Sequence, residues 1–387
     1  MDLREKLVRT YGDAPEEMRM FQSPGRVNLI GEHIDYNGGS VFPAALTMVS
    51  TVCARKRRDN TIQLLATDLD EVVRADYHSL DEHRGIRWGN YQLGVAKELL
   101  EAGYKLAGCD MIFEDKVPLG SGLSSSAAIE VVTAFTLLHL SGYHDVPLVE
   151  IARIAQRAEH RFVGVHCGIM DQFASAMGKK DHAILLDTRT LEYRHVPMDM
   201  KGYKVVIANT NKKRSLGDSA YNQRRKECEQ ALADIQVMYG DIDGLCQLSL
   251  QEFEQGRHLI RNEKSLMRAY HAVTENDRVH RSVAALEAGD MAAFGDLLTR
   301  SHVSLRDQYE VSCKELDTLV ELALECPGVA GSRMTGAGFG GCTVSIVREG
   351  DMDGFIDFAA VRYEERIGYP AAFYISEIGD GVKEVTG

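Results

Sequence analysis

Residues 117–128 read VPLGSGLSSSAA and join a predicted strand to a predicted helix. The strand centres on residues 111–113, and Val131, Phe135 and Leu138 indicate the helix by their spacing. Glycines let a backbone approach a phosphate closely, and the free N–H groups at a helix start attract anions. The alternative is a flexible connector of glycine and serine. Because three serines run directly into a helix start of small residues, we favour an anion-binding loop.

Two glycine patterns can be compared with known nucleotide-binding motifs. The Walker pattern G-x-x-x-x-G-K-[ST] is absent from the chain, so residues 120–126 are no ordinary P-loop. Residues 336–341 read GAGFGG and contain G-x-G-x-x-G, but a predicted strand at 342–347 follows them, where a dinucleotide fingerprint requires a helix. We therefore exclude nicotinamide and flavin binding here. A tight loop near a ligand and a plain hairpin turn both remain open.

Residues 24–39 read PGRVNLIGEHIDYNGG and contain several polar and charged side chains between glycines. Glu32, His33 and Asp35 fall within four residues, and Tyr36 follows them. Such charged and titratable side chains are unfavourable in a hydrophobic core, so the cluster indicates either a solvated turn or a ligand pocket. Carboxylates accept hydrogen bonds from sugar hydroxyls, and a pocket built on such bonds rejects analogues that lack them by roughly 10⁴-fold or more. The segment predicts a pocket for a polyol.

Asp171 is the candidate acid, in the stretch CGIMDQ at residues 167–172. It stands at the start of a predicted short helix, where aspartate is also ordinary capping chemistry. Glu159 lies twelve residues earlier, on the preceding predicted helix, and by itself would be a surface charge. The residues alone leave both alternatives open.

The chain of 387 residues is long enough for two domains, and we place the boundary near 190–202, giving 1–195 and 196–387. Strands are not regularly followed by helices, which favours an α+β class over a doubly wound sheet. Residues 47–57 and 61–67 are rich in β-branched side chains and predict a hairpin across 58–60. The basic run at 55–58 then predicts a solvated strand edge rather than a nucleic-acid patch.

Composition excludes several classes of protein. Hydrophobic residues make up 44% and charged residues 26%, ordinary values for a globular chain. With 44 Lys and Arg against 57 Asp and Glu the net charge is −13, which opposes binding to nucleic acid or anionic membranes. The longest nearly apolar stretch, 127–140, is too short to span a bilayer. Eight cysteines without C-x-x-C spacing predict reduced thiols in a cytoplasmic protein.

Four of these segments together resemble one known family. Residues 25–36 are similar to the galactokinase signature, and residues 120–128 to the phosphate loop of the wider GHMP kinase superfamily. Residues 336–341 are similar to the third motif of that superfamily, and residues 167–172 to the galactokinase segment that carries the catalytic aspartate. The motifs occur in family order and cover nearly the whole chain.

The resemblance implies a two-domain GHMP kinase fold of mixed sheets and helices, with the active site in the cleft between the domains. It implies transfer of the γ-phosphate of ATP to the C1 hydroxyl of D-galactose, giving galactose 1-phosphate and ADP, the first committed step of galactose use by the Leloir pathway. Asp171 would face the C1 hydroxyl with Arg26 beside it. Magnesium, as Mg²⁺, would be held by Ser126 and Glu159.

The resemblance also assigns two sets of binding residues. The ATP phosphates would lie on Gly120, Ser121, Gly122, Leu123, Ser124, Ser125 and Ser126. Galactose would be lined by Glu32, His33, Asp35, Gly168 and Tyr221. Trp88 and Tyr91 would lie near the adenine, with a plain core role as the alternative.

Two other functions stay open at this stage. An N-acetylgalactosamine kinase would differ by room near C2 of the sugar. A catalytically silent galactose sensor is disfavoured, because such relatives lack part of the serine–alanine stretch that is complete here at 124–128 and because Asp171 is present. With no coiled coil or exposed apolar stripe in the sequence, we expect a monomer.

Overall fold

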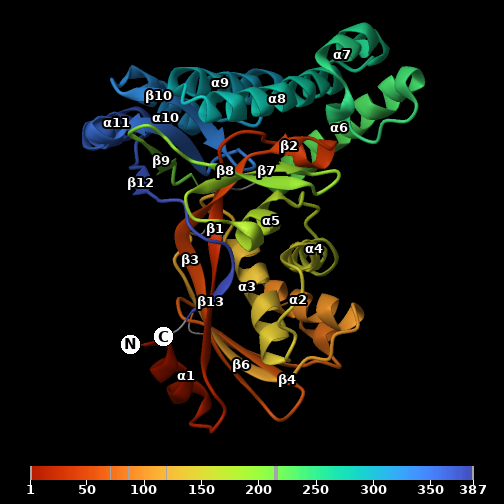
Figure 1. The fold of residues 1–387 in the computed structure, drawn as a ribbon, viewed down its shortest axis with the longest axis vertical. Helices are drawn as coiled ribbons and strands as arrows, with labels where there is room; N and C mark the ends of the chain where they lie inside the picture. Colours follow the sequence, from red (N-terminus) through yellow and green to blue (C-terminus); the bar gives the residue numbers. More distant parts are fainter. Residues whose placement is uncertain (1, 70, 86–87, 119, 213–216, 386–387) are drawn as a thin grey trace.

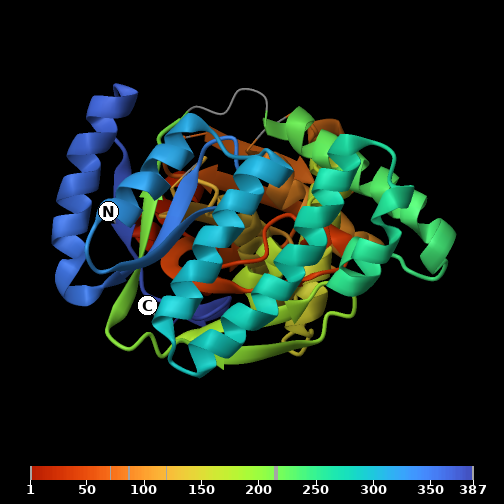
Figure 2. The same cartoon turned by 90° about the horizontal axis from the view of Figure 1, so that it is seen from above.

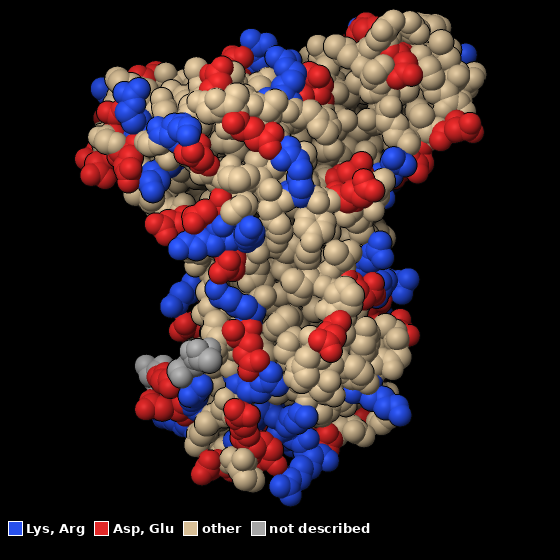
Figure 3. All heavy atoms as spheres, in the orientation of Figure 1, with Lys and Arg blue, Asp and Glu red and all other residues tan. Residues whose placement is uncertain are grey.

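A computed structural model describes residues 2–69, 71–85, 88–118, 120–212 and 217–385. Helices and strands are mixed along the chain and form three sheets within the described residues. The α+β class predicted from the sequence is therefore confirmed. The molecule is elongated and narrows near its middle (Figure 3).

The largest sheet has the strand order β13-β1-β3-β6-β4-β5. Its members are β1 (Arg19–Asn28), β3 (Pro43–Lys56), β4 (Thr61–Ala66), β5 (Glu71–Asp76), β6 (Cys109–Asp115) and β13 (Lys383–Val385). Side chains alternate between its two faces, as strand geometry requires. Val52 and Ala54 of β3 join the main core, whereas Cys53 between them packs with Leu3 and Leu7 on the other face.

Helices cover both faces of this sheet. The first face is covered by α2 (Gly89–Glu101), α3 (Ser125–Leu140), α4 (Leu148–Ala158) and α5 (Met170–Met177), and the second by α1 (Leu3–Tyr11). Helix α3 lies against β1 and β3 and is enclosed by α2, α4 and α5 (Figure 1). It is apolar nearly all round, which is the pattern of a buried helix. Its N-terminus, where the glycine–serine loop ends, is thereby held rigidly.

The hairpin predicted across residues 58–60 is wrong, because β3 and β4 are not neighbours. Strand β6 lies between them, antiparallel to β3 and parallel to β4. Two strand spacings are about 10 Å, and four extended residues can span about 13 Å, so the short loop simply crosses over the end of β6. The backbone N–H of Arg57 donates to the carbonyl of Gly108 at this crossing, at 2.7 Å. The β-branched pattern identified two strands but could not identify their partners.

The predicted solvated edge at residues 55–58 is wrong for the same reason, since β3 is an interior strand. Arg55 is buried and its Nε donates to Asp110 Oδ2 at 2.9 Å. Arg57 binds the other oxygen of Asp110, also at 2.9 Å. Within the run, Lys56 and Arg58 do project into solvent, and 85% of the Arg58 side chain is exposed.

A second sheet, in the order β10-β11-β9-β12, forms the other end of the molecule. It comprises β9 (Tyr203–Asn209), β10 (Val329–Thr335), β11 (Cys342–Arg348) and β12 (Ala372–Ile375). On one face lie α8 (Glu263–Glu287) and α9 (Met291–Ser304), and on the other α10 (Lys314–Glu325) and α11 (Met352–Ile367). Seen from above, α8 and α9 run across the top of the molecule (Figure 2). Two further helices, α6 (Gly217–Tyr239) and α7 (Leu250–Gly256), extend to one side (Figure 1).

A small sheet of β2 (Ser40–Val41), β7 (His182–Asp187) and β8 (Tyr193–Pro197) lies between these two parts. The division into residues 1–195 and 196–387 stays a prediction, and a clean cut there would pass through β8. The chain also returns late to the first sheet, where β13 pairs with β1 through the register Phe21–Glu384. The two parts are thus joined by more than one segment.

The surface carries charges of both signs. On the face drawn in Figure 3, basic and acidic side chains are interspersed over both parts of the molecule. Within the described ranges, the helices are all too short or too polar to cross a membrane.

Candidate functional site

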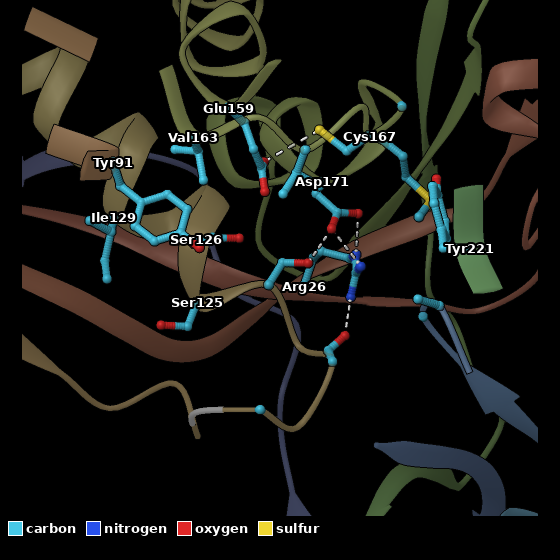
Figure 4. Close-up of a pocket in the computed structure, with 18 of the residues that line it drawn as sticks. Arg26, Tyr91, Ser125, Ser126, Ile129, Glu159, Val163, Cys167, Asp171 and Tyr221 are labelled. Carbon is cyan, nitrogen blue, oxygen red and sulfur yellow. Dashed lines mark hydrogen bonds and ion pairs between the residues drawn. The ribbon is translucent and has the colours of Figure 1, made fainter. Parts of the chain in front are cut away.

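A cavity of about 980 Å³ opens between the two parts of the molecule. It is lined by β1 and the segment after it, the loop before α3, the turn after α4, the start of α5, α6 and the β10–β11 turn. The four segments that the sequence analysis singled out therefore meet around one space, shown in close-up in Figure 4.

The glycine–serine loop lies along one wall of this cavity. Gly120 and Gly122 have φ values of +69° and +83°, a left-handed backbone that glycine adopts without strain. Ser124 precedes the first turn of α3 with φ +61°, also left-handed. This sharp turn directs the free N–H groups of α3 toward the cavity, which is the geometry of an anion site. Gly120, Gly122, Ser124, Ser125 and Ser126 line the cavity, as predicted for the loop.

Two residues of the predicted loop set point the other way. The side chains of Ser121 and Leu123 are fully buried. The Ser121 hydroxyl donates to Pro118 O at 2.6 Å and accepts from Leu123 N at 3.2 Å. These two hydrogen bonds stabilise the turn of the loop. Leu123 O accepts from Arg26 N at 2.9 Å and ties the loop to β1. Any contact of these two residues with a phosphate would come from the backbone.

Arg26 and Asp171 form the centre of the site. Arg26 Nε donates to Asp171 Oδ1 at 2.8 Å, and Arg26 Nη2 donates to Asp171 Oδ2 at 2.7 Å. Arg26 Nη1 donates to Gly122 O at 2.6 Å, and the Ser124 hydroxyl donates to Asp171 Oδ2. The arginine therefore links the acid directly to the glycine–serine loop (Figure 4).

The electrostatics of the site favour the charged form of Arg26. Burial by itself would lower the pKa of Arg26, but the charges of Asp171 and Glu32 raise it overall. The Asp171 side chain keeps 29% exposure toward the cavity, whereas Arg26 keeps 4%. The carboxylate, and not the guanidinium, is thus the group that a ligand can reach most easily.

Glu32 is bound mainly to the protein itself. Its carboxylate accepts from Gly336 N at 2.6 Å, from Thr335 Oγ1 at 3.1 Å and from Asn28 Nδ2 at 2.7 Å. The fully buried Arg333 pairs with it at 3.3 Å. Glu32 lines the cavity, and it also holds the loop of the signature segment against the β10–β11 turn.

His33 is a neutral imidazole in this site. Burial is the largest of the effects that lower its pKa to about 3. Its Nε2 lies 3.2 Å from Ala337 O and its Nδ1 lies 2.8 Å from Tyr36 Oη. Because a carbonyl can only accept, Nε2 carries the proton and Nδ1 accepts from the tyrosine.

Asp35 and Gly168 lie in close contact. A Cβ at Gly168 would stand 1.6 Å from Asp35 Oδ2, so only glycine fits beside this carboxylate. Burial first, and then the charges of Asp171 and Glu32, raise the pKa of Asp35 to about 7. Tyr221 of α6 completes this end of the cavity, with its ring 5.5 Å from that of His33. All five residues predicted to line a sugar therefore border the cavity together.

Ser126 and Glu159 turn into the same cavity from opposite helices (Figure 4). Glu159 begins a single π-helical turn, η3 (Glu159–Val163), that follows α4, and such turns are frequent at functional sites. Its Oε2 accepts from Gln172 Nε2 at 2.6 Å and from Cys167 Sγ at 3.3 Å. Burial first, and then the charge of Asp171, raise the pKa of Glu159 to about 7.

The donor set at Ser126 and Glu159 fits Mg²⁺. A hydroxyl and a carboxylate are oxygen ligands of the kind that this ion prefers, and a cation would relieve the excess negative charge that raises the pKa of Glu159. Among the described residues, no group of three His, Cys, Asp or Glu side chains forms a complete metal cage.

Several aromatic and aliphatic side chains also line the cavity. Trp88 and Tyr91 lie there at the start of α2, with Ile129, Val163 and Phe113 around them. Aromatic and aliphatic side chains beside an anion loop suit a nucleotide base, and the placement of Trp88 and Tyr91 near adenine stays a prediction.

The glycine run at 336–341 is a turn between two antiparallel strands, β10 and β11. This confirms that it is no dinucleotide fingerprint. Four of its residues, Gly336 to Phe339, line the cavity, so this hairpin turn borders the candidate site.

Sequence reasoning missed several residues of the site. Three fully buried polar side chains contact residues that line the cavity or contact one another beneath it: Arg333, Gln172 and Glu130. Gln172 stands next to Asp171, which was a possible signal. Arg333 is the one charged residue of β10, which is otherwise made of uncharged residues, and a charge in such a strand was the other available signal.

Comparisons with known proteins agree along the whole chain. The model of the galactokinase galactose-binding signature matches residues 5–56, that of the GHMP kinases N-terminal domain residues 90–179, and that of the GHMP kinases C-terminal domain residues 282–362. The galactokinase of Clostridium tetani is 47% identical over 384 residues, covering 99% of this chain and 97% of its own. The galactokinase of Clostridium acetobutylicum is 50% identical over 370 residues, covering 95% and 94%. The chain belongs to the galactokinase family.

Solved structures extend the agreement to three dimensions. The crystal structure of Lactococcus lactis galactokinase complexed with galactose matches with a TM-score of 0.95 at 42% identity, covering 99% of both chains. Mevalonate kinase of Methanococcus jannaschii matches with a TM-score of 0.68 at 16% identity, covering 95% of this chain and 100% of that chain, and shares the fold alone. The GHMP kinase fold predicted from the sequence is confirmed. In this member of the galactokinase family, the signature segment and the phosphate loop meet at the Arg26–Asp171 pair.

Proposed function

We propose that the protein transfers the γ-phosphate of ATP to the C1 hydroxyl of D-galactose, giving galactose 1-phosphate and ADP. The observation that carries this proposal is the position of the Arg26–Asp171 pair. It stands between the phosphate loop, which it contacts through Gly122 and Ser124, and the polar pocket around Asp35. A sugar hydroxyl in that pocket would lie beside both the acid and the terminal phosphate.

Asp171 orients the hydroxyl and accepts its proton. The C1 oxygen forms a bond to the γ-phosphorus, the bond from that phosphorus to the bridging oxygen breaks, and ADP leaves with the bridging oxygen. A carboxylate is a far weaker base than an alkoxide. The proton therefore moves to Asp171 only as the new oxygen–phosphorus bond forms and the hydroxyl becomes acidic.

Arg26 supplies positive charge close to the transferred group. Phosphoryl transfer depends on alignment and on neutralising charge, with little covalent help from the protein. The N–H groups at the start of α3 add to this field. The chain as a whole is acidic, so these local groups matter more than the net charge of −13.

The galactose pocket selects hydroxyls by hydrogen bonding. The carboxyl groups of Asp35 and Glu32 can accept hydrogen bonds from sugar hydroxyls. The neutral imidazole of His33 carries its proton on Nε2. Gly168 lets the sugar and Asp35 approach the chain closely. When bound at Ser126 and Glu159, Mg²⁺ would neutralise charge on the ATP phosphates.

A coupled assay of ADP release tests the proposal. Purified protein with ATP and Mg²⁺ is expected to release ADP when D-galactose is added and not in its absence. N-acetylgalactosamine, offered at the same concentration, is the competing substrate, and faster turnover with it would overturn the choice of sugar. Galactose binding without ADP release would instead indicate the sensor. The predicted monomer and the cytoplasmic location stay predictions, and light scattering after size exclusion tests the first.

A further inference from the structure

The amide of Gln172 and the carboxyl of Glu130 lie directly behind Glu159, and the mechanism above uses neither. Both side chains have 0% exposure. Gln172 follows Asp171 on α5, Glu130 belongs to α3, and Glu159 follows the last residue of α4. The three side chains therefore connect three helices at the floor of the cavity.

One amide group joins the two carboxyls. Gln172 Nε2 donates to Glu159 Oε2 at 2.6 Å and to Glu130 Oε2 at 3.1 Å. The amide nitrogen is thus shared between the carboxyls of two different helices. Glu130 holds the amide from one side, and the amide in turn holds the carboxyl of Glu159.

This arrangement leaves polar atoms unpaired. Gln172 Oε1 and Glu130 Oε1 are buried without a hydrogen-bond partner among the described residues. Native interiors contain few such atoms, because each one loses its hydrogen bonds to water. Apolar side chains of the same volume would pack here at lower cost, so stability does not account for the cluster.

We propose that Gln172, held in place by Glu130, is a positioning residue that keeps the Glu159 carboxyl turned into the cavity toward Ser126. This inference rests on the proposed role of Glu159 and Ser126 as ligands of Mg²⁺. Groups that orient a metal ligand typically change metal affinity by about 10- to 100-fold when they are removed.

The test measures how much Mg²⁺ tightens the binding of ADP. Calorimetric titration gives the Kd of ADP in EDTA and in saturating Mg²⁺, and the ratio of the two reports the metal site without any turnover. Gln172→Met keeps the volume and removes the donor, and it is expected to reduce this ratio by about 10-fold with the galactose Kd unchanged. Glu130→Leu is expected to act in the same direction. Glu130→Gln keeps an oxygen that can accept from Gln172 and is expected to retain the wild-type ratio.

Matched variants separate the possible outcomes. Thr136→Val, on the same helix as Glu130, removes a buried hydroxyl that has no partner among the described residues and is expected to leave the ratio unchanged. If Glu159→Gln keeps the wild-type ratio, the metal role of Glu159 is wrong. If Glu159→Gln abolishes the effect of Mg²⁺ while Gln172→Met and Glu130→Leu preserve it, the positioning role alone is wrong. Should Gln172→Met not fold, Gln172→Asn, which draws the amide back by one methylene, replaces it.

Discussion

Arg26 and Asp171 are separated by 145 positions in the chain and are joined by two parallel hydrogen bonds of 2.8 and 2.7 Å. Such a two-bond arginine–carboxylate pair fixes both position and orientation of the acid. The same arginine binds the carbonyl of Gly122, so the acid, the phosphate loop and β1 form one rigid unit. Several consequences of this unit can be measured.

Replacing Asp171 with asparagine is expected to lower kcat by roughly 10²-fold or more. The amide cannot accept the proton of the sugar hydroxyl, whereas the rest of the galactose pocket is unchanged. Steady-state kinetics together with a galactose titration provide the measurement, and the galactose Kd should stay close to that of the wild type. Asp199→Asn, an exposed change far from the pocket, is the control. Turnover within a few-fold of normal would remove Asp171 from the mechanism.

Arg26→Lys is expected to reduce kcat by at least about 10-fold with little change in the KM for galactose. A lysine ammonium is a single point charge and cannot reach both oxygens of Asp171 and the carbonyl of Gly122 together. The double variant Arg26→Lys/Asp171→Asn should show a smaller fold-reduction in kcat than the product of the fold-reductions of the two single variants, because the residues act as a unit. Arg300→Lys, on the exposed face of α9, serves as the control. Fully independent effects would contradict the coupling.

Gly168→Ala is expected to raise the KM for galactose by at least about 10-fold, with a smaller effect on kcat. The new Cβ would stand 1.6 Å from Asp35 Oδ2 and 2.3 Å from its Cγ, so the carboxylate must leave its position. Because the displaced carboxylate would no longer present its oxygens to the sugar hydroxyls, galactose binding is expected to weaken more than turnover. Gly354→Ala is the matched control, because its Cβ would meet no atom within 4 Å. An unchanged KM would show that Asp35 does not contact the sugar.

The stability of the ligand-free protein is expected to depend on pH through Asp35. Its pKa is raised from 3.8 to about 7 in the folded state, mainly by burial, so the folded protein retains a proton that the unfolded chain has lost. The contribution of Asp35 to the free energy of unfolding therefore falls as pH rises from about 4 to 7, by at most about 1.4 kcal/mol per pH unit, and does not change further above that range. Asp35→Asn removes this contribution.

Urea denaturation of wild type and Asp35→Asn between pH 5 and 8 checks this dependence, since the difference between the two isolates Asp35. The variant should gain stability relative to the wild type with increasing pH. A difference that is independent of pH would contradict the raised pKa.

Arg333→Met is expected to destabilise the fold by roughly 3–5 kcal/mol, because it leaves the buried carboxylate of Glu32 without its cation. It also removes the donor to the carbonyls of Asn28 and Leu29, at 3.0 and 2.9 Å. Denaturant unfolding gives the measurement. Arg348→Met on the adjacent strand β11, where 62% of the side chain is exposed, should change stability by no more than about 0.5 kcal/mol. Similar losses in both variants would argue against a special role for the buried pair.

Local pattern was a reliable guide to the elements that line the cavity. The glycine–serine run before α3, the acidic cluster at 32–35 and the short helix at Asp171 were all predicted from spacing and residue type, and the resemblance that they carry was confirmed. Pattern was a poor guide to strand partners, as the crossing of β3 and β4 over β6 shows. A β-branched run indicates a strand but carries no information about which distant strand will pair with it.

The sequence by itself determined which chemical groups the site contains, because each motif brings its own acids, glycines and hydroxyls within a few residues. Only the tertiary structure decided which of them are linked. Arg26 with Asp171, Glu32 with Arg333 and Gln172 between two carboxyls are contacts over long separations. Charges of this kind can be buried only when the packing of several elements brings a partner within hydrogen-bond distance, and no local pattern encodes that condition.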